Sequence, residues 1–210
     1  MSSSHRLINH PLLDHKLSFL RDKTTSSADF RQITKDIATF LTYEAMRDWN
    51  DIDEISVETP LKTTKVRRIS NPPVIVTIMR AGNPFQEAAL DVLPFSSAGH
   101  IGIYRDKFIN NTVEYYFKLP KNVKDRPILL CDPLIATADT MIAALERLKN
   151  YEVGSIKIIS LLVIQSALDR IYNFFPDVEI FSLSKEEKLT EDGYLIPGLG
   201  DAGDRLFETF

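Results

Sequence analysis

The chain has one cysteine and no long apolar segment, and these two features exclude several classes of protein. Cys131 has no partner for an intramolecular disulfide, so a reducing cytoplasm is the expected location. No apolar run approaches the ~18 residues of a transmembrane helix, so we expect no membrane partner. With 44% hydrophobic and 26% charged residues, the composition is that of an ordinary folded domain.

An excess of basic residues is also missing. The 25 basic and 29 acidic side chains give a formal net charge of −4. Broad nucleic-acid binding requires a basic face, so we expect no nucleic-acid partner. If the substrate is an anion, a few local cations and backbone amides must bind it.

Most short motifs of common catalytic sites are absent. The four histidines lack the spacing of a zinc site, and there is no G-x-S-x-G nucleophile elbow. Residues 198–203 formally match G-x-G-x-x-G, but the seven residues that follow are too few for a dinucleotide-binding βαβ unit. We interpret this segment as a loop whose backbone amides approach a ligand, with an ordinary surface loop as the alternative.

Largely apolar runs alternate with amphipathic helical segments. Such runs are typical of strands buried on both faces of a parallel sheet. They occupy residues 74–79, 127–131, 156–163 and 178–183. The predicted fold class is α/β, a mainly parallel central sheet flanked by helices. The length suits a single domain over 1–210, divided into an N-terminal helical arm at 1–25, a small β extension at 55–69 and a C-terminal loop region at 184–210.

Three candidate site residues directly follow predicted strands, namely Arg80, Arg105 and Asp132. The carboxyl ends of parallel strands meet at one edge of a sheet, where such sheets bind ligands. A guanidinium matches phosphate oxygens well, so an anionic ligand is indicated. For either arginine taken singly, a salt bridge to a neighbouring carboxylate is an equal alternative.

The segment Asp132–Thr140 lies between a predicted strand and a predicted helix. A loop that opens a helix presents unpaired N–H groups, which suit a phosphate. The ordinary alternative is a plain strand-to-helix connection in which Asp139 is the helix N-cap. The loop lacks glycine and the Walker sequence, so its spacing alone favours that alternative.

Taken together, the motifs resemble those of the uracil phosphoribosyltransferases, from about His10 to the C-terminus. They follow one another as HPLLDHKLSFLRDK, LTYEA, IMRAG, GHIGIYRD, YYFKLP, DPLIATADT and YLIPGLGDAGDR. The last stretch is the most characteristic. The resemblance implies a phosphoribosyltransferase-like fold and a pentosyltransferase that converts uracil and phosphoribosyl pyrophosphate into uridine monophosphate and pyrophosphate.

The resemblance also implies a role for particular residues. Asp132 and Asp201 would be catalytic. The phosphoribosyl pyrophosphate site would contain Arg80, Arg105, Asp132, Pro133, Leu134, Ile135, Ala136, Thr137, Ala138, Asp139, Thr140 and Asp201. Uracil would contact Leu195, Gly200, Asp201 and Ala202, which makes 184–210 the base-binding region. Mg²⁺ would be bound through the pyrophosphate with no direct protein ligand, GTP is a possible activator, and a homodimer or larger homo-oligomer is expected.

Two departures from the family pattern concern the donor side. Family members typically have two glycines where this chain has Ala138 and Asp139. If Ala138 has a positive φ, it costs ~1–2 kcal/mol, and a carboxylate ~4 Å from a phosphate repels it by ~4 kcal/mol before screening. Asn83–Pro84–Phe85 replaces the usual Leu-Gly-Met, so Pro84 should stiffen that loop and remove one amide donor. The alternative to an active enzyme is therefore an impaired homologue that acts as a uracil- or nucleotide-binding sensor or a structural subunit.

Overall fold

A computed structural model describes residues 4–106 and 111–209, with the side chains at 4, 105, 106 and 111 excepted. Its centre is an eight-stranded sheet in which seven strands form one continuous path. In spatial order these are β1 (Ser4–Leu7), β10 (Glu179–Glu186), β9 (Ile156–Ile164), β7 (Ile128–Cys131), β4 (Val74–Met79), β5 (Ala98–Asp106) and β6 (Asn111–Lys118). Every neighbouring pair is parallel except β5 and β6, and β8 (Leu134–Ile135) pairs with β9 outside this path.

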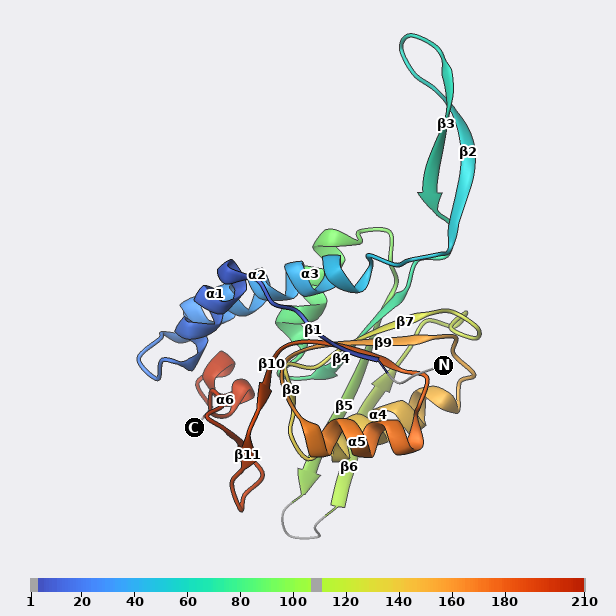
Figure 1. Cartoon of the computed structure of the whole chain (residues 1–210). Coiled ribbons are helices and arrows are strands. Elements are labelled where there is room, and N and C mark those ends of the chain that lie inside the picture. The colour runs from blue at the N-terminus through green and yellow to red at the C-terminus, as the bar shows by residue number, and fades with distance from the viewer. Residues whose placement is uncertain (1–3, 107–110, 210) are drawn as a thin grey trace.

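Helices cover both faces of the sheet (Figure 1). One face carries α1 (Pro11–Arg21), α2 (Ser27–Ala45) and α3 (Asn83–Val92). The other carries α4 (Asp139–Lys149) and α5 (Gln165–Phe174). The predicted α/β class with a mainly parallel sheet is confirmed. None of the described helices is long and apolar enough to span a membrane.

The apolar runs form the core between these layers. All four residues of β7 are buried, as are eight of the nine residues of β9. The α2 helix presents one apolar face, in which Phe30, Ile37 and Leu41 are fully buried. Each such side chain contributes roughly 1.5–3 kcal/mol through the hydrophobic effect. The largely apolar composition of these strands thus follows from their burial on both faces.

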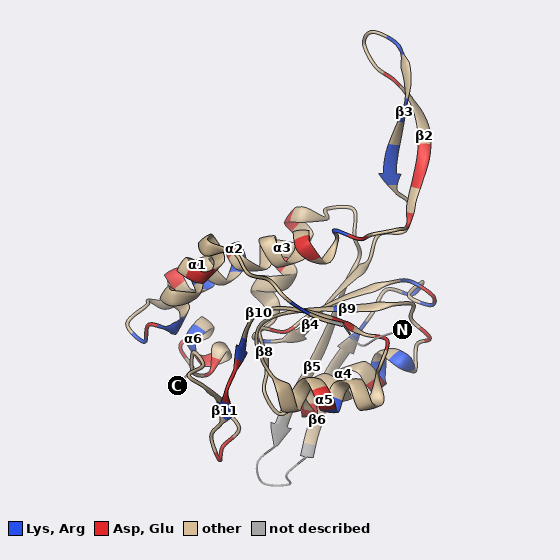
Figure 2. Cartoon of the chain, viewed as in Figure 1, with Lys and Arg blue, Asp and Glu red and all other residues tan. Residues whose placement is uncertain are grey.

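The small β extension is a hairpin that projects from the body (Figure 1). It pairs β2 (Ile52–Glu58) with β3 (Thr63–Ile69) in antiparallel register. Acidic residues gather on β2 and basic residues on β3 (Figure 2), and Asp53 lies opposite Arg68 while Glu54 lies opposite Arg67. Opposite charges across a ladder stabilise an antiparallel pair.

The C-terminal region contains three short elements. These are β11 (Lys188–Leu189), β12 (Leu195–Ile196) and α6 (Ala202–Phe207). The first two form a two-stranded antiparallel sheet, and α6 packs against α2. This packing holds α6, near the C-terminus, against the layer of helices that contains α2.

Candidate functional site

A cleft of about 360 Å³ lies where β4, β5 and β7 end. Of the predicted site residues, it brings together Arg80, Asp132, Pro133, Leu134, Thr140, Asp201 and Ala202. Residues far apart in the sequence therefore meet because parallel strands share one carboxyl edge. The prediction missed other residues of the lining, which are Ile78, Met79, Ala81, Ile103, Tyr104, Tyr115, Tyr194 and Gly203.

Among the described residues, other predicted site residues do not line this cleft. They are Leu195, Gly200 and the middle of the predicted phosphate loop, Ile135 to Asp139. Ile135 is buried in β8 and Leu195 is buried in β12. The backbone of Arg105 is in β5, opposite Thr112, but its side chain lies outside the described part of the structure. The expected role of Arg105 therefore stays a prediction.

Arg80 follows β4 and reaches toward the C-terminal helix. Its Nη2 atom donates a hydrogen bond to Thr209 Oγ1 over 3.2 Å, and its guanidinium lies 5.4 Å from the centroid of the Phe207 ring. Thr209 Oγ1 in turn donates to Asp204 Oδ1 over 2.7 Å. A neutral hydroxyl on this guanidinium can be exchanged for the oxygens of an anion, which bind it more strongly.

The turn after Arg80 requires glycine for steric reasons. A Cβ atom on Gly82 would lie 2.4 Å from Thr77 Oγ1 and 2.5 Å from the Cys131 carbonyl oxygen. Pro84 lies in the first turn of α3, for which Gly82 is the N-cap. This position corrects the expectation that Pro84 stiffens a loop, because its fixed φ suits a helix start. The expected loss of one amide donor stays a prediction.

The segment before α4 meets one condition and corrects one alternative. Ala138 is the N-cap of α4 and has φ 69°, so the condition under which alanine costs ~1–2 kcal/mol is met. Asp139 is therefore the first helical residue, and the alternative in which it is the N-cap is wrong. Its Oδ1 atom accepts a hydrogen bond from Arg170 Nη2 over 2.8 Å. Sequence reasoning missed Arg170, because nothing in the sequence places α5 beside this loop.

Asp132 is the most perturbed carboxyl group of the cleft. It directly follows β7, whose residues are all buried. Burial raises the pKa of Asp132 to about 7, partly opposed by a hydrogen bond from the Leu134 backbone amide. Near neutral pH this group can therefore change its charge, which is typical of functional sites.

The segment 194–205 is held in an irregular path beside the cleft. The Ile196–Pro197 bond is cis, and Gly198 and Gly200 have positive φ values of 60° and 81°. A Cβ atom at Gly198 would lie 2.1 Å from the Leu195 carbonyl oxygen, so no larger residue fits there. Asp201 caps α6 by accepting a hydrogen bond from the Asp204 amide over 2.9 Å.

Two arginines fasten this segment to the end of α1. Arg205 donates to the backbone oxygens of Leu20, Leu199 and Asp22. Arg21 donates to the Gly198 oxygen over 2.8 Å. Since charged donors make strong hydrogen bonds, the loop is preorganised without contributions from a ligand.

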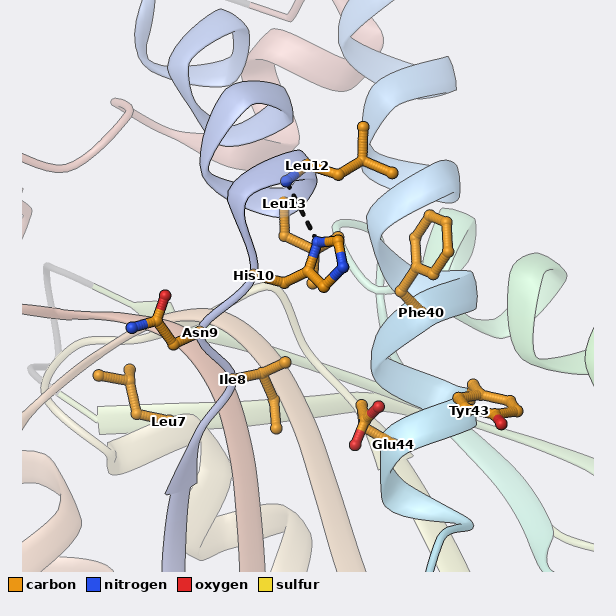
Figure 3. Close-up of a pocket in the computed structure, with 9 residues that line it drawn as sticks. All are labelled: Leu7, Ile8, Asn9, His10, Leu12, Leu13, Phe40, Tyr43 and Glu44. Carbon is orange, nitrogen blue, oxygen red and sulfur yellow. Dashed lines mark hydrogen bonds between the residues drawn. The ribbon is translucent and has the colours of Figure 1, made fainter.

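A second hollow of about 230 Å³ lies between the start of α1 and α2 (Figure 3). Its lining is mostly apolar and includes Phe40 and Tyr43, and it contains no lysine or arginine. The His10 ring faces this hollow, and its Nδ1 atom accepts the hydrogen bond of the Leu12 amide over 3.1 Å, which caps α1 (Figure 3). Without a cation this hollow is a poor site for a polyanion.

The fold is that of a phosphoribosyltransferase. Adenine phosphoribosyltransferase from Leishmania donovani superposes with a TM-score of 0.60 at 13% identity, over 92% of this chain and 88% of that one. The AQ2163 protein of Aquifex aeolicus superposes with a TM-score of 0.92 at 33% identity, over 98% of each chain.

Sequence comparisons narrow this class to one family. The family model described as uracil phosphoribosyltransferase matches residues 7–209. A protein of that name from Polaromonas naphthalenivorans is 43% identical over 210 residues, the whole of both chains. Another from Clostridium botulinum is 43% identical over 203 residues, 96% of this chain and 97% of its own. The chain therefore belongs to the uracil phosphoribosyltransferase family, as its motifs indicated.

Proposed function

We propose that this chain transfers the phosphoribosyl group of phosphoribosyl pyrophosphate to uracil, giving uridine monophosphate and pyrophosphate. The observation that carries the proposal is the cleft that joins Arg80, Asp132 and Asp201 in a chain of this family. In the reaction a bond forms between N1 of uracil and C1 of ribose, the bond from C1 to pyrophosphate breaks, and uracil loses its N1 proton.

The donor side of the cleft would use charge and backbone amides. Arg80, together with Arg105, would bind the pyrophosphate. The loop from Asp132 to Thr140 would bind ribose and its 5′-phosphate at the start of α4. The ionised Asp132 carboxylate would accept from the ribose hydroxyls and stabilise the positive charge that develops on the sugar. Little acid–base chemistry is then required, because pyrophosphate is a good leaving group once its charge is neutralised.

Uracil would be recognised mainly by backbone groups of the segment 194–205. Leu195, Gly200, Asp201 and Ala202 are the proposed contacts with uracil. Two glycines with positive φ point successive peptide groups in directions that regular structure does not allow. A fixed pattern of N–H and C=O groups distinguishes uracil from cytosine, since their exocyclic groups differ in donor and acceptor character.

Mg²⁺ is the proposed cofactor. Among the described residues, no three His, Cys, Asp or Glu side chains gather in a way that could hold a metal ion. The ion would therefore arrive bound to the pyrophosphate of the donor, with no direct protein ligand, and the hard carboxylate oxygens of Asp132 and Asp201 at the cleft would suit its hydration shell. When bound, the ion neutralises the pyrophosphate as it leaves.

Formation of uridine monophosphate tests the proposal. Purified protein is incubated with labelled uracil, phosphoribosyl pyrophosphate and Mg²⁺, and product is quantified against a blank without protein. Asp132→Asn is the matched variant, and we expect product from the natural chain and at least ~100-fold less from the variant. No product at millimolar donor would contradict the proposal and favour the sensor or structural subunit.

Self-association and regulation are further parts of the proposal. The projecting hairpin supports a homodimer, because a two-stranded ribbon is only marginally stable alone and its Leu61 side chain is 94% exposed. Light scattering on the natural chain and on Leu61→Ser would test this.

Activation by GTP is proposed from the family resemblance, and comparing the reaction rate with and without GTP tests it. We also propose that residues 1–210 form one functional domain. A cytoplasmic location is proposed because the one cysteine, Cys131, is free and buried.

A further inference from the structure

The carboxylate that seemed to disfavour phosphate binding is held by an arginine of the neighbouring helix. Asp139 is the first residue of α4, and its Oδ1 atom lies 2.8 Å from Nη2 of Arg170 on α5. The Asp139 side chain is 28% exposed and that of Arg170 is 48% exposed. The pair therefore lies at the rim of the loop, where both groups stay hydrated.

The same guanidinium also contacts the backbone of the loop that precedes α4. Arg170 Nη1 donates to the carbonyl oxygen of Thr137. One side chain thus joins residues 137 and 139, which flank Ala138 with its left-handed φ of 69°. On another side, Gly193 packs against this loop, because a Cβ atom there would lie 3.2 Å from Thr137 Cγ2.

Charge explains why this contact matters for a phosphate. The N–H groups of the first turn of α4 have no carbonyl partner within the helix, and such groups attract an anion. An unpaired carboxylate on the first helical residue would repel a second negative group at the same helix end. Pairing Asp139 with Arg170 cancels that charge locally. The hydrogen bond to Thr137 also keeps a backbone carbonyl directed toward α5.

We propose that Arg170 is a positioning residue for the donor's 5′-phosphate: it neutralises Asp139 and fixes the backbone on either side of Ala138. The proposal rests on the proposed function, because it takes the 5′-phosphate of phosphoribosyl pyrophosphate as the ligand of this loop. An exposed ion pair contributes little to folding stability, so the effect should appear in donor binding.

A double-mutant cycle tests this assignment. The four proteins are the natural chain, Arg170→Ala, Asp139→Ala and the double variant. For each, calorimetry gives the Kd of phosphoribosyl pyrophosphate with Mg²⁺, and steady-state kinetics give the separate KM values of donor and uracil. Arg170→Ala should weaken donor binding by about tenfold or more, while the uracil KM changes less than about twofold.

The decisive result is the dependence of this loss on Asp139. In the Asp139→Ala background, removal of Arg170 should change the donor Kd by less than about threefold, because no carboxylate is left to neutralise. A loss of equal size in both backgrounds would overturn the proposal, because Arg170 would then act on donor binding independently of Asp139. A donor Kd in Arg170→Ala within about twofold of the natural value would overturn it as well.

Two further variants separate this role from general damage. Arg170→Lys retains the positive charge and should recover most of the lost affinity. Lys124→Ala removes a cation from an exposed ion pair with Glu152. Neither residue belongs to the proposed site, so this variant should leave the donor Kd unchanged. If the natural chain binds the donor but forms no uridine monophosphate, the proposed function is contradicted, while the binding data still test the role of Arg170. If the natural chain does not bind the donor at all, the proposed function and the role of Arg170 are both overturned.

Discussion

Arg21 and Glu186 form a two-point ion pair across 165 residues of sequence. Arg21 Nη2 donates to Glu186 Oε1 over 2.6 Å, and Nη1 donates to Oε2 over 3.0 Å. The Glu186 side chain is 1% exposed and also accepts the Gly198 amide over 2.7 Å. The pair therefore ties the segment 194–205 to both α1 and β10.

Removing Arg21 should strongly destabilise the fold. Arg21→Ala leaves the buried Glu186 carboxylate without its cation, and we expect the free energy of unfolding to fall by about 3–5 kcal/mol. Urea denaturation measures this change. Arg47→Ala breaks an exposed pair with Glu44 and serves as the control, with an expected loss below about 1 kcal/mol. Equal losses in the two variants would contradict a structural role for the Arg21–Glu186 pair.

Acid should weaken the same contact. Burial alone would raise the pKa of Glu186, but hydrogen bonds from Arg21, the Gly198 amide and Ser184 outweigh it and lower the pKa below 4.5. The stabilisation is therefore fully present above pH 4.5 and is lost as pH falls through the lowered value. The stability difference between the natural chain and Glu186→Gln should be constant from pH 5 to 7 and shrink below about pH 4. A difference independent of pH down to pH 3 would show that the charge has no part in it.

Ala138→Gly should stabilise the chain. The left-handed φ of 69° at Ala138 costs a residue with a Cβ ~1–2 kcal/mol, whereas glycine adopts it freely but loses more entropy on folding. The expected gain is about 0.5–1 kcal/mol, measured by urea or thermal unfolding. Ala136 is not among the described residues with positive φ, so Ala136→Gly should instead reduce stability. A gain of the same size in both variants would contradict the strain argument.

Activity should rise with pH as Asp132 ionises. Its pKa is raised to about 7, and we expect the carboxylate form to bind the ribose hydroxyls. The kcat/KM for the donor should therefore increase toward a plateau above pH 7, since this parameter reports ionisations of the free enzyme. The Asp132→Asn variant should lack this rise. A profile that is flat from pH 5.5 to 8.5 would contradict the assignment.

The same ionisation should affect stability with the opposite sign. Between pH 3.8, the ordinary value, and about 7, the folded state retains a proton on Asp132 that the unfolded state has lost. Stability from this group therefore falls as pH rises through that window. Relative to the natural chain, Asp132→Asn should become more stable by up to about 4 kcal/mol between pH 4 and 8. Equal pH dependence in the two proteins would sink this explanation.

Gly82→Ala should destabilise the turn between β4 and α3. The new Cβ would lie 2.5 Å from a backbone oxygen and 2.4 Å from Thr77 Oγ1, so the strand end must shift. We expect a loss of about 1–3 kcal/mol, together with a raised donor KM because Arg80 moves with the turn. At Gly203 the nearest atom would be 3.2 Å away on the Asp201 side chain, so Gly203→Ala is the matched control for stability. Similar stability losses in both variants would contradict the steric argument.

The fold could be predicted where hydrophobic patterning was long and regular. The buried strand at 74–79 and the helix that ends at Lys149 agree with β4 and α4 to within a residue. Hydrophobic patterning did not predict β1, β6 or the short β8, β11 and β12 as strands. Two-residue strands have no periodicity to recognise, and β1 becomes a strand only because β10 offers it a parallel partner.

The candidate site divides in the same way. The sequence by itself determined the family, the α/β class and the strand-end residues Arg80 and Asp132, because apolar periodicity and local motifs are written along the chain. The tertiary structure alone decided that Arg170 neutralises Asp139 and that Arg21 reaches Glu186. Contacts between distant segments depend on how helices and strands pack, and no local pattern of residue types specifies that packing.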